Sequence, residues 1–140
     1  MIVVDSSALV AILRDEPSAD RLMERLDREP EGARWISVAS YIETGTVLAG
    51  RRLQRPLTAI EYLDEFLADS GIDLAPVDVE QGRIALRARI VYGRGFGSRA
   101  GLNYGDSFSY ALAKSKSAPL LYIGNDFDKT DIVSALKTTR

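Results

Sequence analysis

The stretch Ile2-Val3-Val4-Asp5 decides the expected fold, because it is a short apolar run that ends in a carboxylate. Two later runs have the same form: Ile36-Ser37-Val38 leads toward Glu43, and Leu120-Leu121-Tyr122-Ile123 leads into Asn125-Asp126. Neighbouring parallel strands of an open α/β sheet bring their carboxyl ends to one edge, where such folds place their ligands. We therefore expect the acids that follow these runs to converge.

The segments between the apolar runs carry helix signals. We expect one helix over Ser7 to Leu13, capped by Ser6 or Ser7. A second helix is expected to begin at Pro17-Ser18, and another to cover Val79 to Tyr92. Crossovers long enough for a helix join parallel strands. The sequence therefore predicts an α/β fold, with a mostly parallel central sheet of four to five strands and helices on both faces. Ile132-Val133 is the candidate for a fifth strand.

Helical spacing also predicts which side chains face the core. The expected inward positions are Val38, Ile42, Gly45 and Ala49 in the helix after the second apolar run, and Ile84, Leu86 and Ile90 or Val91 in the Val79 to Tyr92 helix. Glu43 is expected on the flank of the first stripe. A polar connection is expected over Arg51 to Pro56.

Composition limits the classes of protein. With 140 residues, 46% of them hydrophobic, we expect one domain over residues 1–140, with a core of about 1–133 and a short C-terminal tail. The apolar N-terminal run is expected to be a strand and not a signal peptide, and no run is long enough to span a membrane. We expect a soluble, intracellular protein.

The chain contains no histidine and no cysteine. This excludes thiolate zinc sites and disulfide scaffolds. A cluster made only of carboxylates suits a hard, oxygen-preferring cation. The acids at the sheet edge therefore point to a magnesium-dependent hydrolase.

Charge is unevenly distributed, although the net charge is only −2. The window from Gln81 to Gly105 contains no acid, and its arginines are Arg83, Arg87, Arg89, Arg94 and Arg99. A basic flank beside an acidic centre suits a polyanionic substrate. The Gly-rich loop in this window is either an ordinary solvated loop or a basic lip in which Arg94 and Arg99 meet phosphates and Phe96 stacks on an unpaired base.

Each acid also has a purely structural interpretation. Asp106, which is expected to begin a helix, is either a capping side chain or a metal ligand. Asp5 and Asp126 could be polar strand ends, and Glu43 a solvated helix residue. The structural interpretation requires several acids to reach one rim by coincidence.

Several motifs together resemble one known family. They are Asp5-Ser6-Ser7-Ala8, Glu43 after the second apolar run, Leu102-Asn103-Tyr104-Gly105-Asp106-Ser107-Phe108, Gly124-Asn125-Asp126-Phe127 and Thr130-Asp131-Ile132. In this order and over nearly the whole chain, the sequence resembles the PIN-domain ribonucleases, and among them the VapC-type toxins of bacterial toxin-antitoxin pairs.

The resemblance implies a cytoplasmic endoribonuclease that uses Mg²⁺, with Mn²⁺ as the alternative, and leaves a 5′-phosphate. It implies an RNA substrate, a homodimer, and inhibition by a VapB-type antitoxin. The protein would contact DNA only indirectly, through that antitoxin. The implied acidic site residues are Asp5, Glu43, Asp106 and Asp126, the implied polar ones are Ser7, Asn103 and Thr130, and Asp128 and Asp131 are looser candidates.

The chemistry of these residue types leads to the same reaction. A carboxylate-held divalent ion neutralises charge on a phosphodiester and makes water a better nucleophile. Asp5 and Asp106 are the first choice for direct ligands. Glu43 would orient or deprotonate the attacking water, and Asp126 would complete the charge and could hold a second ion. Two alternatives are a receiver-like or dehalogenase-like phosphotransfer domain, in which Asp5 is phosphorylated, and a catalytically silent binding module.

Overall fold

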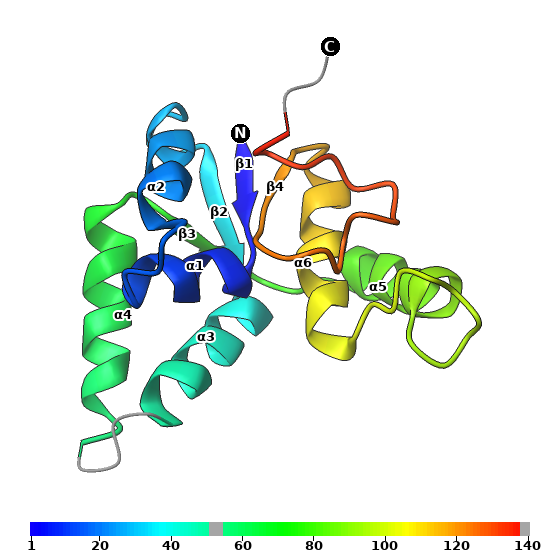
Figure 1. Cartoon of the computed structure of the whole chain (residues 1–140), viewed down its shortest axis with the longest axis horizontal. Helices are drawn as coiled ribbons and strands as arrows, with labels where there is room; N and C mark the ends of the chain where they lie inside the picture. The colour runs from blue at the N-terminus through cyan, green and yellow to red at the C-terminus, as the bar shows by residue number, and fades with distance from the viewer. Residues whose placement is uncertain (51–54, 138–140) are drawn as a thin grey trace.

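The structure is a computed structural model that describes residues 1–50 and 55–137. Figure 1 shows strands in the middle and helices on either side. The elements are β1 (Ile2–Val4), α1 (Ser6–Leu13), α2 (Ala19–Asp27), β2 (Arg34–Ser37), α3 (Val38–Gly50), α4 (Thr58–Asp69), β3 (Asp73–Ala75), α5 (Val79–Tyr92), α6 (Tyr104–Ser115) and β4 (Leu120–Leu121). The expected alternation of strands and helices is confirmed.

The four strands form one parallel sheet in the order β3-β2-β1-β4. Val3 in β1 is the register partner of Trp35 on one side and of Leu120 on the other. The carboxyl ends of β1, β2 and β4 consequently lie side by side. The expected fifth strand at Ile132-Val133 does not form, because among the described residues this segment contributes only an isolated bridge between Leu120 and Ser134.

Alternation along β1 divides the hydrophobic core into two layers. Ile2 and Val4 pack with side chains of α1, α2, α3 and α4, whereas Val3 packs with side chains of α5 and α6. Figure 1 shows the corresponding arrangement, with α1 to α4 on one side of the strands and α5 and α6 on the other. Both faces of the sheet are therefore covered by helices, as predicted. Polar and charged side chains that follow the strands can reach solvent only at the edges of the sheet.

The predicted inward stripe of α3 is right at Ala49, which packs against the core, and wrong at Val38 and Ile42, which are exposed. The buried side chains of this helix are Ser40, Thr44 and Leu48, while Ile42 is 61% exposed. Two of the three buried side chains are polar, so a pattern search for large apolar residues cannot find this face. The Thr44 hydroxyl donates to the Ser40 carbonyl of the same helix, and the Ser40 hydroxyl is hydrogen-bonded to Ser109 of α6. These hydrogen bonds offset the free-energy cost of burying the two hydroxyls.

The inward stripe of α5 is right at Ile84, which packs against the core, and otherwise misplaced. Gln81, Ala85 and Ala88 are buried, whereas Leu86 and Ile90 are 65% and 54% exposed. Alanine lets α5 approach its neighbour closely, and the larger side chains are left outside. This outer stripe is a surface that a partner could cover.

Part of the chain lies outside the described residues. The expected polar connection over Arg51 to Pro56 includes residues 51–54, and the expected C-terminal tail includes residues 138–140. Within the part of the chain that the structure describes, no helix has the length and apolar character needed to cross a bilayer.

Candidate active site

Asp5 lies at the carboxyl end of β1 and is 3% exposed. It is the N-cap of α1, where we expected Ser6 or Ser7, and its Oδ2 accepts hydrogen bonds from the Ser7 backbone N–H (3.0 Å) and the Ser7 hydroxyl (2.6 Å). Its Oδ1 accepts a hydrogen bond from Ser109 of α6 (2.5 Å). The carboxylate is thus fixed by three donors from two helices.

Asp106 is the third residue of α6, which begins two residues earlier than expected. It forms a capping box with Asn103: the Asp106 N–H donates to Asn103 Oδ1 (2.8 Å), and the Asn103 N–H donates to Asp106 Oδ2 (3.1 Å). The capping interpretation of Asp106 is therefore confirmed. The capping box uses Oδ2, and among the described residues no donor hydrogen-bonds to Oδ1, which is available to the site.

Glu43 links α3 to the starts of α1 and α6. The Ser6 hydroxyl donates to Glu43 Oε1, and Oε2 lies against the α carbon of Gly105. A β-carbon at position 105 would collide with this carboxylate, so glycine is required for Glu43 to occupy its place. Asp106 is the next residue along the chain.

Asp126 follows β4 on an exposed segment. This segment is tied to α1, because the Ile123 N–H donates to the Ser7 hydroxyl (3.1 Å), which in turn donates to Asp5. The Asp5 N–H also donates to the Leu121 carbonyl (2.9 Å). The chain after β4 is thereby held beside the end of β1.

The four acids share one electrostatic environment. Burial raises the pKa of Asp106 to about 7, against the lowering effect of its Asn103 backbone hydrogen bond, and the charges of Asp5, Asp126 and Glu43 raise it further. No ion pair of the described residues includes any of these acids. Negative charge therefore accumulates at this edge without an ion-paired cationic side chain from residues 1–50 or 55–137.

This donor set fits a hard divalent cation in its chemistry, since it consists of carboxylate oxygens and excess negative charge. In residues 1–50 and 55–137, however, no three acidic side chains converge closely enough to form a complete ligand set. Mg²⁺ retains several waters and needs few direct protein ligands, so the arrangement suits an ion held partly through water.

Ser7 and Asn103 lie beside the acids, as the preceding contacts show, but Thr130 does not contact them. Its hydroxyl donates to the Phe127 carbonyl (2.7 Å) and accepts from the Ile132 N–H (3.2 Å) within a local turn. The two looser candidates are likewise occupied elsewhere. Asp128 pairs with Lys137 and Asp131 with Lys114, and tyrosine hydroxyls donate to both.

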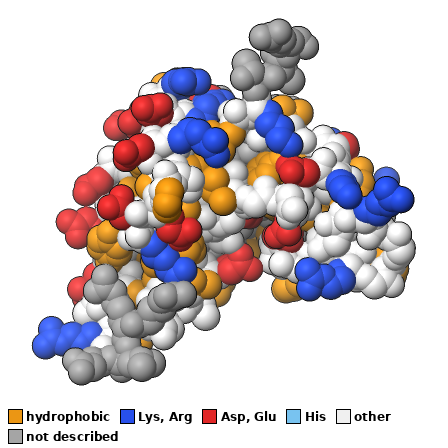
Figure 2. All heavy atoms as spheres, viewed as in Figure 1, with side chains coloured by type: hydrophobic (Ala, Val, Ile, Leu, Met, Phe, Trp, Pro, Cys, Tyr) orange, Lys and Arg blue, Asp and Glu red, His pale blue; other side chains and the backbone are white. Residues whose placement is uncertain are grey.

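Arg94 and Arg99 extend from an exposed loop between α5 and α6. The loop is closed at its base, because the Arg94 N–H donates to the Leu102 carbonyl (3.1 Å) and the Leu102 N–H to the Tyr92 carbonyl (2.9 Å). Figure 2 shows lysine and arginine side chains on the lobe that α5 and this loop form, with acidic side chains nearer the middle of the same face. The predicted charge separation is therefore present.

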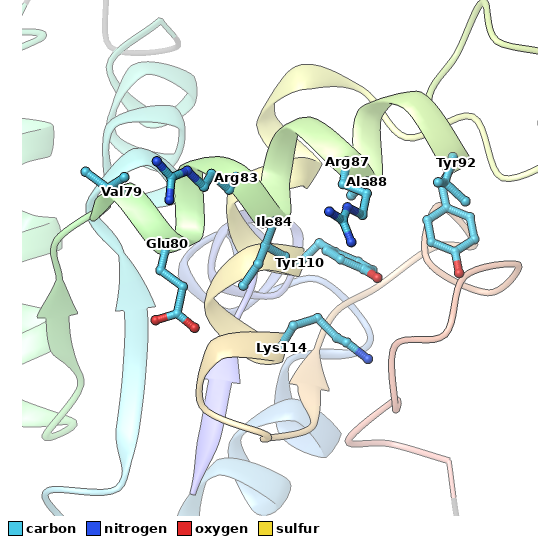
Figure 3. A pocket seen from close by; sticks show the side chains of 10 residues that line it. Val79, Glu80, Arg83, Ile84, Arg87, Ala88, Tyr92, Tyr110 and Lys114 are labelled. Carbon is cyan, nitrogen blue, oxygen red and sulfur yellow. The ribbon is translucent and has the colours of Figure 1, made fainter.

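A cleft of about 790 Å³ lies beside α5 and α6, away from the acids. Figure 3 shows Arg83, Arg87, Tyr110 and Lys114 around it, and Asp5, Glu43, Asp106 and Asp126 do not line it. Size alone would direct attention to this cleft. The unneutralised carboxylates identify the sheet edge as the better candidate for catalysis.

The sequence interpretation missed four residues that shape the site: Ser6, Ser40, Gly105 and Ser109. Gly105 was quoted only as part of a motif, and its role depends on the approach of a side chain from α3. The serines of α3 and α6 left a weak signal, since they are polar residues on helix faces that pack into the protein.

Comparison with known proteins agrees with the fold. The PIN domain family model matches residues 2–133. Ribonuclease VapC30 of Mycobacterium tuberculosis is 45% identical over 132 residues, which cover 94% of this chain and 96% of that protein. Ribonuclease VapC42 of the same species is 42% identical over 130 residues, which cover 93% of this chain and 95% of that protein.

A solved structure has the same fold. The sarcin-ricin loop cleaving toxin VapC20 of Mycobacterium tuberculosis superposes with a TM-score of 0.70 over 95% of this chain and 97% of its own, at 19% identity. The chain belongs to the PIN-domain family. Within that family it is a VapC-type member, as its identity of 42 to 45% to VapC ribonucleases over nearly its full length shows.

The raised pKa of Asp106 makes a testable prediction for the metal-free protein. Because the folded pKa of about 7 lies above the value in the unfolded chain, the folded state holds an extra proton between about pH 4 and 7. Stability should fall as pH rises through this range and then level off. Between pH 5 and pH 8, the free energy of unfolding of the parent should fall by about 1 to 3 kcal/mol relative to that of Asp106→Asn, after allowance for solvent screening.

Urea unfolding of both proteins in EDTA at each pH measures this difference. Asparagine accepts the same capping hydrogen bond, so the comparison isolates the charge. A difference in unfolding free energy that stays constant from pH 5 to pH 8 would contradict the electrostatic crowding.

Proposed function

We propose that the protein is a Mg²⁺-dependent endoribonuclease and the toxin of a type II toxin-antitoxin pair, acting in the cytoplasm. The observation that carries the proposal is the group of mutually repelling carboxylates at the sheet edge, with which no basic side chain of the described residues forms an ion pair. The VapC ribonucleases that this chain resembles supply the substrate class. Mn²⁺ is the alternative ion.

The chain's own groups have distinct roles in this proposal. When bound, Mg²⁺ neutralises phosphate charge and makes water more nucleophilic. Asp5 and Asp106 hold the ion, Asp126 adds negative charge from the neighbouring segment, and Glu43 accepts a proton from the attacking water or orients it. A carboxyl such as Asp106, with a pKa of about 7, exchanges protons readily near neutral pH.

The sequence around Asp5 does not favour phosphotransfer. Receiver-like and dehalogenase-like domains need a second acid close to the nucleophile, such as Asp-x-Asp, and Asp5-Ser6-Ser7 lacks one. A silent binding module would have no use for carboxylates crowded at a cost in stability.

The first test is cleavage of a single-stranded RNA with defined ends. We expect Mg²⁺-dependent internal cleavage that leaves a 5′-phosphate and stops in EDTA, and a rate at least about 100-fold lower for Asp5→Asn. Asp131→Asn is the matched control, because it removes an acid that pairs with Lys114 away from the cluster. Full activity of Asp5→Asn, or cleavage that persists in EDTA, would refute the proposal.

We propose further that the exposed loop with Arg94 and Arg99 contacts RNA phosphates. Replacing both arginines by alanine should weaken RNA binding and reduce the slope of log affinity against log salt by about 1.4, because about 0.7 is expected per single-strand phosphate contact. Fluorescence anisotropy in EDTA measures binding without cleavage. The double variant Arg83→Ala/Arg87→Ala removes two arginines that line the separate cleft, and an equal change in that control would contradict a specific role for the loop.

We propose a VapB-type antitoxin as the protein partner, and contact with DNA only through it. An apolar groove of about 280 Å³ between α3 and α4, with Leu57 and Ile60 exposed at its rim, offers an apolar segment a place to bind. Leu22 and Leu26 of α2 are fully buried and belong to the core, so they offer no surface to a partner. Failure of the protein encoded by an adjacent small reading frame to co-purify or inhibit cleavage would contradict this partner.

A homodimer is proposed from the outer face of α5. Leu86 and Ile90 are neighbours on this helix and are more than half exposed, which is unusual for large apolar side chains one turn apart. The double variant Leu86→Lys/Ile90→Lys should convert a dimer into a monomer in sedimentation equilibrium. Leu57→Lys, at a similarly exposed leucine just before α4, should leave the mass unchanged, and a monomeric parent would exclude the dimer.

A further inference from the structure

Two buried serines form a hydrogen-bonded chain that ends on Asp5. The Ser109 hydroxyl donates to Asp5 Oδ1 (2.5 Å), and the hydroxyl oxygens of Ser40 and Ser109 lie 2.9 Å apart. Ser109 is 0% and Ser40 2% exposed, so water does not reach either of them. The chain joins α3, α6 and the end of β1.

The directions of these hydrogen bonds follow from counting protons. A serine hydroxyl has one proton to donate, and that of Ser109 is used on Asp5. The Ser40 hydroxyl must therefore be the donor to Ser109. Every hydrogen bond of the chain therefore donates in one direction, from Ser40 of α3 to Ser109 of α6 and from Ser109 to the Asp5 carboxylate.

The lone pairs of Asp5 show what this chain achieves. A carboxylate has about four lone-pair sites, two on each oxygen. The N–H and O–H of Ser7 occupy both sites on Oδ2, and Ser109 occupies one on Oδ1. One site on Oδ1 remains, and its direction is set by where Ser109 holds that oxygen.

Packing alone does not account for the two serines. Alanine at both positions would fill nearly the same space between α3 and α6 and bury no polar atom, whereas a buried hydroxyl gains little net stability even when it is bonded. Other buried side chains of α6, such as Ala111 and Ala113, are alanines. The serines occur at the point where α6 passes Asp5.

We infer that Ser109 and Ser40 are positioning residues, which hold the one free lone pair of Asp5 toward a divalent cation. The inference rests on the proposed function, because it assigns these serines to the same metal-binding carboxylate. Ser109 acts directly on Asp5, and Ser40 acts only by fixing the Ser109 hydroxyl. Groups that orient a metal ligand in this way typically contribute 10- to 100-fold to metal affinity.

The test is calorimetric titration of the full chain with Mg²⁺ and with Mn²⁺, without RNA. We expect Ser109→Ala to weaken binding by about 10- to 100-fold and Ser40→Ala by less. The double variant should bind as Ser109→Ala does, since Ser40 has no other route to Asp5. Ser109→Cys, which keeps a weak donor of similar size, should lie between wild type and Ser109→Ala.

The matched control is Ser107→Ala. Ser107 is a 1% exposed serine of the same helix whose hydroxyl donates to the Tyr104 carbonyl (2.6 Å). Its loss should lower the melting temperature and leave metal affinity within about twofold, the reverse of the pattern expected for Ser109. If Ser109→Ala does not fold, Ser40→Ala, which is one step removed from Asp5, carries the test.

Two results would overturn this inference without affecting the proposed function. The first is a metal affinity that is unchanged in both Ser109→Ala and Ser40→Ala. The second is a loss of metal affinity in the double variant that equals the product of the two single losses. A wild-type chain that binds neither ion would overturn the proposed function as well. The wild-type titration therefore tests the proposed function, and the ratio of variant to wild-type affinity tests the role of the serines.

Discussion

The structure depends on holding several carboxylates close together at one end of a parallel sheet. Like charges repel, and burial removes the water that would screen them, which is why the pKa of Asp106 rises to about 7. Such an arrangement is unfavourable for the isolated chain. It persists because β1, at an inner position of the sheet, is anchored on both sides and Asp5 follows it directly.

Helix termini and hydroxyls offset part of this cost. Asp5 caps α1 and Asp106 closes the capping box of α6, so both acids lie where unpaired N–H groups and the positive end of the helix dipole favour negative charge. Ser6 and Ser109 donate to Glu43 and Asp5. The same residues therefore stabilise the fold and build the site.

The sequence predicted what depends on local pattern. The apolar runs that precede the acids predicted β1, β2 and β4 and their parallel arrangement, and the boundaries of α5 agree with the structure residue for residue. The inward faces of α3 and α5 were predicted only in part, since a search for large apolar residues overlooks a contact built from Ser40, Ala85 and Ala88. Contacts between distant segments, such as Glu43 against Gly105, leave no trace in local spacing.

The two interpretations of Asp106, as helix cap and as metal-site acid, prove to be compatible. Its Oδ2 is used by the capping box, while the charges of Asp5, Asp126 and Glu43 act on the same carboxyl group and help to raise its pKa. Capping needs only an acceptor, which asparagine also supplies, whereas holding a cation needs the charge. A helix start is therefore a suitable position for a metal-binding carboxylate, because the capping hydrogen bond fixes one oxygen and leaves the other available to a cation.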